Sequence, residues 1–437
     1  MITINREVVN NDRKNSILIK NARVISPKQC LDSVCDILIE DGKIKSVGTQ
    51  SAQADVVIDA SGLIASPGLV DMHVHLRDPG QTYKEDIISG CKAAAAGGVT
   101  SLLAMPNTTP ATDSAETVSY ILDKAKNANA KVYVAGSISK DLKSLEPTDI
   151  DELKNAGAIA LTDDGRPVEN TKMLANALVK AEKLNMAVVA HCEDLYLAKG
   201  GKINEGEVSE QLGIKGIPKA AEDCGTSREI ALAAAYDVPV HICHVSTATS
   251  VALIRDAKAR GVKVTAETAP HYFSLTDKEL LKRDADFRMN PPLRTESDRL
   301  AIIKGLCDGT LDAIATDHAP HSPQEKADFV NAPNGSIGME TSLSVGITYL
   351  VDTGILTINE LIEKMSVNPS KILNINAGSI EENAPADIVL FDMNESYTVS
   401  TDKLHGKSKN TPFKNMTLKG KVKFTILDGK IVFTDEA

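Results

Sequence analysis

Three things that this sequence lacks narrow its class. Its 437 residues contain no run of about 18 uninterrupted apolar residues, the length that a membrane-spanning helix needs, and its polar first residues form no signal-peptide core. The seven cysteines are odd in number and include no C-x-x-C pair, so no disulfide framework is predicted and no cysteine is a candidate ligand. A net charge of −11 disfavours a basic face for nucleic acid or anionic lipid. We therefore expect a cytoplasmic protein with no nucleic-acid and no membrane partner.

The composition is typical of a large globular protein, and both ends of the chain are predicted to be β-structure. Hydrophobic residues make up 42% and charged residues 24%, which suffices for a sizeable core. Each end alternates apolar and polar positions around an Asp-Gly pair, the short-range signal of a β-hairpin. These segments are 17–24 and 36–48, with Asp41-Gly42, and 386–393 and 421–433, with Asp428-Gly429. We expect the two ends to pair into one small β-sandwich.

Between the ends, short apolar runs alternate with segments of helical period, which indicates repeated β-α units and a parallel sheet. Helices are predicted at 85–97, 171–185 and 227–237. The predicted strands are 68–75, 99–105, 131–136, 158–162, 187–191, 238–244, 262–267 and 312–317. Eight strands over about 250 residues is the count of a (β/α)8 TIM barrel. The predicted fold is therefore α/β, with a catalytic barrel at 66–378 and a β-sandwich built from 1–65 and 379–437.

Polar residues gather at the carboxyl ends of the predicted strands, where the active sites of such barrels lie. His73 and His75 end the first strand and, being two apart, point to the same face. Other strand ends carry Asp163-Asp164, His191, His244 and Asp317. Histidine and carboxylate together suit zinc, although manganese, cobalt or iron would accept the same ligand types. Because unpaired polar groups in apolar runs would cost roughly a few kcal/mol each, the pattern predicts a metal site rather than a set of buried polar residues.

The other five histidines are given different roles. His241 faces away from its neighbour on the sixth strand and is predicted to pack behind the site. His271 follows the seventh strand, where ordering a loop and taking part in catalysis both fit its position. His405 lies outside the barrel and is expected to have no role in the site. Of His318 and His321, which follow the eighth strand, His321 is the better candidate for a substrate contact.

Ten ordered segments that carry these residues resemble the amidohydrolase superfamily, and within it the type I dihydroorotases. They are GLVDMHVHLRDPG (68–80), AMPNTTP (104–110), LTDDGRPV (161–168), AHCED (190–194), LGIKGIPKAAED (212–223), HVSTA (244–248), ETAPHYFSLTD (267–277), MNPPLR (289–294), ATDHAPH (315–321) and NGSIGMETSL (334–343). The resemblance implies reversible hydrolysis and cyclisation between dihydroorotate and N-carbamoyl-aspartate in pyrimidine biosynthesis, by metal-bound hydroxide.

The resemblance also implies a role for each site residue. The ligands of one or two zinc ions would be His73, His75, Asp164, His191, His244 and Asp317. The substrate contacts would be Arg77, Asn107, Asn290, His321, Asn334 and Gly335. Asp317 would in addition be the catalytic base, which accepts the proton of the attacking water and passes it to the ring nitrogen. Asp164 is preferred to Asp163 because its spacing of 27 residues to His191 matches the family pattern, and the choice between them stays open here.

One position separates this family from its relatives. Dihydropyrimidinases, also called hydantoinases, and allantoinases carry a lysine after the fourth strand that becomes carboxylated and bridges two metals, whereas this chain reads Leu161-Thr162-Asp163-Asp164-Gly165. Those activities are the alternatives, and Arg77, whose planar fork can hold a carboxylate, also counts against them. A non-enzymatic alternative is an inactive dihydroorotase-like partner of aspartate transcarbamoylase. Every ligand position is kept, so an enzyme is favoured, with that partner or a homo-oligomer as an addition.

Overall fold

The computed structural model describes residues 2–4, 16–49 and 52–435, and it confirms the predicted barrel. Eight parallel strands lie in the order β16-β15-β14-β11-β10-β9-β8-β7, so that strands next to each other in sequence are also next to each other in space. Their bounds are β7 Leu69–Val74, β8 Val99–Ala104, β9 Lys131–Gly136, β10 Ala160–Leu161, β11 Ala187–Ala190, β14 Val240–Ile242, β15 Val264–Thr268 and β16 Ala313–Ile314. Apolar side chains such as Met72, Leu103 and Val189 fill the interior, so the barrel has a closed floor.

The barrel closes between its first strand and the segment that follows its last strand. Val74 forms a parallel bridge with His318, and the backbone N–H of His75 donates to the His318 carbonyl at 2.8 Å. Below this bridge, the Asp71 carboxylate accepts a hydrogen bond of 3.0 Å from the Thr316 backbone N–H and another from its hydroxyl. The closure therefore brings the start and the end of the barrel chain together at one point of the mouth.

Three of the predicted strands, 158–162, 238–244 and 312–317, are clearly longer than the strands observed. In the last two, the backbone leaves the extended region at the polar ends, where His244 has φ +35° and Asp317 has φ +49°. Both values lie in the left-handed region, which is unfavourable for residues with a β-carbon. The two candidate ligands therefore lie on bends just past β14 and β16. The predicted strands included both residues because the strand-like pattern of the sequence continues through these bends.

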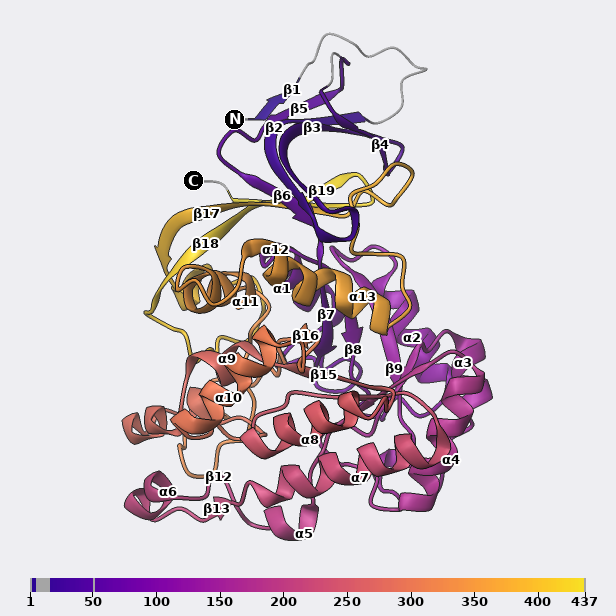
Figure 1. Ribbon diagram of the computed structural model, residues 1–437, viewed down its shortest axis with the longest axis vertical. Helices are drawn as coiled ribbons and strands as arrows, with labels where there is room; N and C mark the ends of the chain where they lie inside the picture. The colour runs from indigo at the N-terminus through magenta and orange to yellow at the C-terminus, as the bar shows by residue number, and fades with distance from the viewer. Residues whose placement is uncertain (1, 5–15, 50–51, 436–437) are drawn as a thin grey trace.

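Helices surround the barrel, and Figure 1 shows α3, α4, α7 and α8 along its outer side. The principal ones are α1 Ile87–Ala96, α2 Ala115–Ala125, α3 Ile150–Ala156, α4 Thr171–Lys183, α7 Ala220–Tyr236, α8 Ala248–Ala259 and α10 Glu296–Cys307. The predicted helix at 227–237 begins earlier than expected, at Ala220, because Ala221, Glu222 and Gly225 of its first turns are buried against the barrel. Within the described ranges, no helix combines the length and apolar character needed to cross a membrane.

Shorter elements occupy the loops and the segment that leads back to the sandwich. They are α5 Leu195–Ala198, β12 Ile203–Asn204, α6 Glu207–Leu212, β13 Gly216–Ile217, α9 Pro270–Ser274, α11 Ser342–Gly346, α12 Ile358–Ile362 and α13 Asn368–Ile372. In Figure 1 the helices α11, α12 and α13 lie between the barrel and the strands at the top of the view.

The two ends of the chain form one sheet of nine strands above the barrel, as predicted (Figure 1). The strands are β1 Ile2–Ile4, β2 Ser16–Ser26, β3 Leu31–Glu40, β4 Lys43–Gly48, β5 Val56–Asp59, β6 Ile64–Pro67, β17 Ile388–Thr398, β18 Thr417–Leu427 and β19 Lys430–Thr434. The sheet joins the two ends where β6 pairs antiparallel with β17. Buried residues of β2, β3, β17 and β18 pack into a core separate from that of the barrel, which makes this unit a small sandwich. Both Asp-Gly turns connect their strands as expected.

Candidate metal centre

Six side chains at the carboxyl ends of the barrel strands meet in one buried cluster. Each is at most 6% exposed, and each stands at the end of its strand or on the bend just beyond it. The six are the predicted ligands His73, His75, Asp164, His191, His244 and Asp317. The barrel topology explains this meeting, because parallel strands deliver their carboxyl ends to the same rim.

Asp164 lies at the centre of the cluster. Its Oδ1 is 3.2 Å from His73 Nε2, 3.6 Å from His191 Nδ1 and 3.7 Å from His244 Nε2. Its Oδ2 is 3.5 Å from His75 Nε2. One carboxylate therefore faces all four histidines.

Asp317 approaches the same histidines from the closing side of the barrel. Its Oδ1 lies 3.1 Å from His75 Nε2 and 3.6 Å from His73 Nε2. Burial alone would raise the pKa of Asp317, but the hydrogen bond with His75 and the nearby charge of His73 lower it to about 2. The pKa of Asp164 is likewise held well below its ordinary value, against the effect of burial, by His73, His191 and His244. Both groups are ionised at neutral pH, the form in which a carboxylate binds a metal.

The cluster fits a divalent cation. Among the described residues, His73 Nε2, Asp164 Oδ1, His191 Nε2 and His244 Nδ1 are buried without a hydrogen-bond partner, which is costly for polar atoms in a protein interior. Two sets of three offer ligand atoms within 4.8 Å of one another: His73 with His75 and Asp317, and His73 with Asp164 and His244. Imidazole nitrogen and carboxylate oxygen are the donors that zinc takes at catalytic sites.

The structure separates the roles of the two neighbouring aspartates. The Asp163 carboxylate points away from the histidines and accepts hydrogen bonds from the backbone N–H groups of Ile138, at 2.7 Å, and Ser139, at 3.1 Å. It also accepts from the Ser139 hydroxyl. Asp163 thus orders the loop after β9, and Asp164 is the one that joins the cluster.

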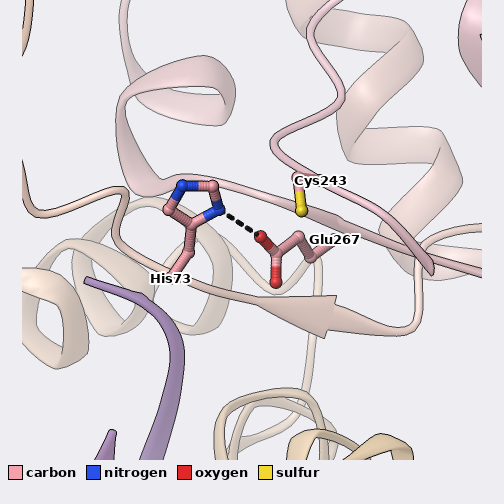
Figure 2. A group of neighbouring side chains, drawn as sticks. All are labelled: His73, Cys243 and Glu267. Atoms are coloured by element: carbon pink, nitrogen blue, oxygen red, sulfur yellow. Dashed lines mark hydrogen bonds and ion pairs between the residues drawn. The ribbon is translucent and has the colours of Figure 1, made fainter. Parts of the chain in front are cut away.

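Two of the histidines are held from behind by residues that the sequence pattern left without this role. His75 Nδ1 lies 2.8 Å from Asn107 Oδ1, while Asn107 Nδ2 donates to Asp164 Oδ2 at 3.4 Å. His73 Nδ1 lies 3.3 Å from Glu267 Oε1, as Figure 2 shows. The only sequence signal for Glu267 was an acidic residue inside an apolar strand, at the start of a segment already quoted as matching the family.

Cys243 also lies beside His73 and Glu267 (Figure 2), within reach of a single ion. Burial raises the pKa of this thiol to about 12, so the sulfur is protonated as long as no metal is bound.

Arg77 lies beside the cluster as a buried cation. Its Nε donates to the Pro320 carbonyl at 3.2 Å, and its terminal nitrogen is 3.5 Å from His321 Nε2. No carboxylate in the described part of the chain forms an ion pair with it. Asp78 and Glu85, two acidic residues close to Arg77 in sequence, have other partners. Asp78 forms an ion pair with Lys124 at 2.6 Å, and Glu85 accepts a hydrogen bond from the Lys407 backbone N–H.

The remaining predicted substrate contacts lie on two sides of the cluster. The backbone carbonyl of Asn334 accepts a hydrogen bond from His321 Nε2 at 2.9 Å. The backbone N–H of Gly335 donates a hydrogen bond to the Arg288 carbonyl, also at 2.9 Å. Asn290 donates to both oxygens of Glu193 at 3.3 Å, and Glu193 Oε2 lies 3.6 Å from the ring of the cluster member His191. Burial and the charges of neighbouring cations lower the pKa of His321 to about 3, so its ring is neutral.

The other histidines lie close to where the sequence placed them. His241 packs behind the site, with Nε2 3.2 Å from Glu267 Oε2. His271 is buried against Tyr272, and burial lowers its pKa to about 4. His318 accepts from the Gly338 backbone N–H at 3.2 Å, and His405 Nδ1 lies 2.8 Å from Glu340 Oε2, away from the cluster.

Comparison with known proteins identifies the family of the chain. A model of the amidohydrolase family matches residues 64–432. The chain is 50% identical over 422 residues to a protein of Geobacter metallireducens named dihydroorotase, covering 96% of this chain and 99% of that protein. It is 49% identical over 424 residues to a dihydroorotase of Acetivibrio thermocellus, with the same coverage.

Solved structures give the same fold. L-hydantoinase from Arthrobacter aurescens superposes with a TM-score of 0.86 at 24% identity, covering 95% of both chains. Dihydropyrimidinase from Brevibacillus agri superposes with a TM-score of 0.84 at 26% identity, covering 96% of this chain and 95% of that one. With a family model that matches most of its length and relatives at half identity over nearly all of it, this chain belongs to the amidohydrolase family.

Proposed function

We propose that this metal-dependent cyclic amidohydrolase is a dihydroorotase, which interconverts dihydroorotate and N-carbamoyl-aspartate. The observation that carries the proposal is Arg77, a buried guanidinium with no carboxylate partner among the described residues, beside a cluster of four histidines and two aspartates. Dihydroorotate carries a carboxylate on the ring, whereas hydantoin and dihydropyrimidine rings do not. A planar guanidinium can hold that group through two parallel charge-assisted hydrogen bonds.

Two further observations support dihydroorotase over the hydantoinases that share the fold. Asp164 stands where the resemblance leads us to expect a carboxylated lysine in hydantoinases, and it can supply oxygen ligands without modification. The relatives at 49–50% identity are named dihydroorotases, whereas the hydantoinase structures are only 24–26% identical.

We propose that the six residues of the cluster hold one or two zinc ions. A bound zinc ion lowers the pKa of water and polarises the attacked carbonyl as a Lewis acid. The protein's own task is then to place the ring and move a proton. Arg77 orients the ring through its carboxylate, with Asn290, Asn334 and Gly335 as further contacts from the surrounding loops.

Asp317 is the proposed base. It is ionised, buried and at the edge of the cluster, so it can take the proton of the attacking water and return it to the ring nitrogen as the amide bond breaks. The reverse sequence closes N-carbamoyl-aspartate into the ring.

A side-by-side assay of the purified, zinc-loaded protein with dihydroorotate, hydantoin and allantoin tests the proposal. We expect kcat/KM for dihydroorotate to exceed the other two by the contribution of one charged contact, about 1.5–3 kcal/mol or roughly tenfold to a hundredfold. A preference for hydantoin or allantoin would instead assign a general cyclic amidohydrolase. Absence of turnover on all three, with zinc bound, would favour the non-enzymatic partner.

Three expectations from the sequence stay predictions: a cytoplasmic location, self-association, and a complex with aspartate transcarbamoylase. Light scattering of the purified chain, alone and mixed with that enzyme, measures the last two.

A further inference from the structure

We propose that Glu267 is a positioning residue for the metal centre: it accepts a hydrogen bond from His73 Nδ1 and so presents His73 Nε2 to the metal without a proton. The inference rests on the proposed metal centre and says what the contact of Glu267 with His73 does there. Glu267 is at the end of β15 and almost completely buried.

The ring of His73 lies between two carboxylates. Its Nδ1 is 3.3 Å from Glu267 Oε1, and its Nε2 is 3.2 Å from Asp164 Oδ1 (Figure 2 shows the Glu267 side). A neutral imidazole carries one N–H, so a proton held on Nδ1 by Glu267 leaves the lone pair of Nε2 free. That lone pair points at the oxygen around which the other histidines gather.

On the floor side of the barrel, Glu267 has a second histidine neighbour. Its other oxygen, Oε2, lies 3.2 Å from His241 Nε2 in an ion-pair contact without hydrogen-bond geometry, and His241 Nδ1 lies 2.8 Å from Thr265 Oγ1. His241 and Thr265 are paired residues of the neighbouring strands β14 and β15, so this contact has rigid backbone on both sides. No lysine or arginine in the described ranges forms an ion pair with Glu267. The charged neighbours of its carboxylate are therefore the imidazole rings of His73 and His241.

Glu267 could instead be a ligand, since its oxygen, His73 and Cys243 lie within 4.8 Å of one another. Two features oppose this. Oε1 already faces His73 Nδ1, and this nitrogen lies across the ring from Nε2, the nitrogen that faces Asp164. The orientation fits a hydrogen-bond acceptor behind a ligand, an arrangement that is common for metal-binding histidines.

The test replaces Glu267 with glutamine, which keeps the shape and removes the charge. We expect zinc to bind about 10–100-fold more weakly, as for other residues that hold a ligand from behind, with the same number of zinc ions per chain at saturation. The measurement is a competition titration of the full chain against a chromophoric chelator. Glu229→Gln is the matched control, because Glu229 is equally buried but pairs with Arg228 on α7. Its zinc affinity should equal that of the wild type.

Either of two results would overturn the inference. Wild-type zinc affinity in Glu267→Gln would leave the residue with a packing role only. Loss of a zinc equivalent at saturating zinc would make Glu267 a ligand. Zinc binding is measured without substrate, so the zinc titration tests the role of Glu267 independently of the dihydroorotate assay. Neither failure nor success of that assay would change the conclusion drawn from the titration.

A second measurement needs no folded Glu267 variant. In wild-type protein with 15N-labelled histidine, the His73 resonances, assigned by their loss in His73→Asn, should show a protonated Nδ1 in the zinc-loaded state. An Nδ1 without a proton, or bound to zinc, contradicts the proposal.

Discussion

At the scale of single residues, the most informative side chain is the unpaired cation Arg77. We expect Arg77→Ala to lower kcat/KM for dihydroorotate by about tenfold to a thousandfold, since each charge-assisted hydrogen bond contributes roughly 1.5–3 kcal/mol. Steady-state kinetics on the zinc-loaded variant measures this, and its zinc content should match the wild type because Arg77 contacts no ligand atom.

Two companion variants sharpen this prediction. Arg77→Lys keeps the charge but loses the fork, so most of its defect should appear as a higher KM. Arg260→Ala removes an exposed arginine that pairs with Asp256 on the outer face of α8, and its kinetics should not change. Normal dihydroorotate turnover by Arg77→Ala would remove the substrate assignment while leaving the metal centre untouched.

The cluster itself was predictable from the strand ends, except for the choice between Asp163 and Asp164, because strand ends in a barrel converge whatever their spacing in sequence. Its supports were not. Glu267 contacts His73, which is 194 residues away in sequence, and Asp71 contacts Thr316, which is 245 residues away. The periodicity of a sequence does not indicate which distant residues form such pairs. Asn107 shows a related difficulty: it was expected to contact substrate, and in the structure its amide joins His75 to Asp164. The substrate role of Asn107 stays a prediction.

At the scale of elements, the loop after β16 carries His321, Asn334 and Gly335 and is fastened by two basic side chains, the half-buried Lys326 and the buried Arg288. Lys326 Nζ donates to the carbonyl of Pro333 at 2.9 Å and to that of Ala285 at 3.0 Å. Arg288 donates to the carbonyls of Phe329 at 2.9 Å and Val330 at 2.7 Å, and to the Asn334 side chain at 3.0 Å. Such contacts hold a long loop in one conformation against the barrel.

Gly335 is the tight point of this loop. Its φ is +138°, and a β-carbon there would lie 2.8 Å from Ala319 Cβ and 2.9 Å from the Ala319 carbonyl. We expect Gly335→Ala to lower the free energy of unfolding by about 1–3 kcal/mol. Because the loop must shift, kcat/KM should also fall, by up to about 100-fold for a displacement near 1 Å. Denaturant unfolding and steady-state kinetics measure the two effects.

The matched control is Gly261→Ala, where φ is +79° and a β-carbon would meet no atom within 4 Å. This variant carries backbone strain of about 1–2 kcal/mol without a steric clash, and it should keep wild-type kcat/KM. Equal activity of the two variants would show that the Gly335 loop does not order the substrate side.

Element types were easier to predict than element ends. The two Asp-Gly hairpins follow from alternation and turn chemistry, which are local. The start of α7 and the ends of β14 and β16 depend on burial against the barrel and on left-handed bends at His244 and Asp317, which only the assembled fold determines.

At the scale of the whole molecule, we propose that 66–378 is the barrel unit and that 1–65 and 379–437 form the sandwich. Strand β6, Ile64–Pro67, spans the first of these boundaries and leads through Gly68 into β7. Its pairing with β17 means that neither end of the chain completes the sandwich without the other.

Metal should stabilise the whole molecule, because its proposed ligands come from five barrel strands. At free zinc a thousandfold above the Kd, binding to the folded state alone contributes about 4 kcal/mol. Chelated protein should therefore melt at a lower temperature than zinc-loaded protein, as followed by circular dichroism. Magnesium, which prefers oxygen ligands, should not raise the melting temperature of the chelated protein to that of the zinc-loaded protein. Equal melting temperatures in protein verified as metal-free and as zinc-loaded would count against the site.

The bridge between Val74 and His318, which closes the barrel, has a consequence for synthesis of the chain. A nascent chain leaves the ribosome from its N-terminus, so His73 and His75 emerge long before the segment that closes the barrel over them. His75 and Asp317, which are in contact in the folded protein, are 242 residues apart in sequence. Until that segment emerges, β7 is an open sheet edge and the half-formed metal pocket is exposed to water. Such contacts of high sequence separation form late, so a prematurely released chain would be an aggregation-prone half-barrel rather than a weak enzyme.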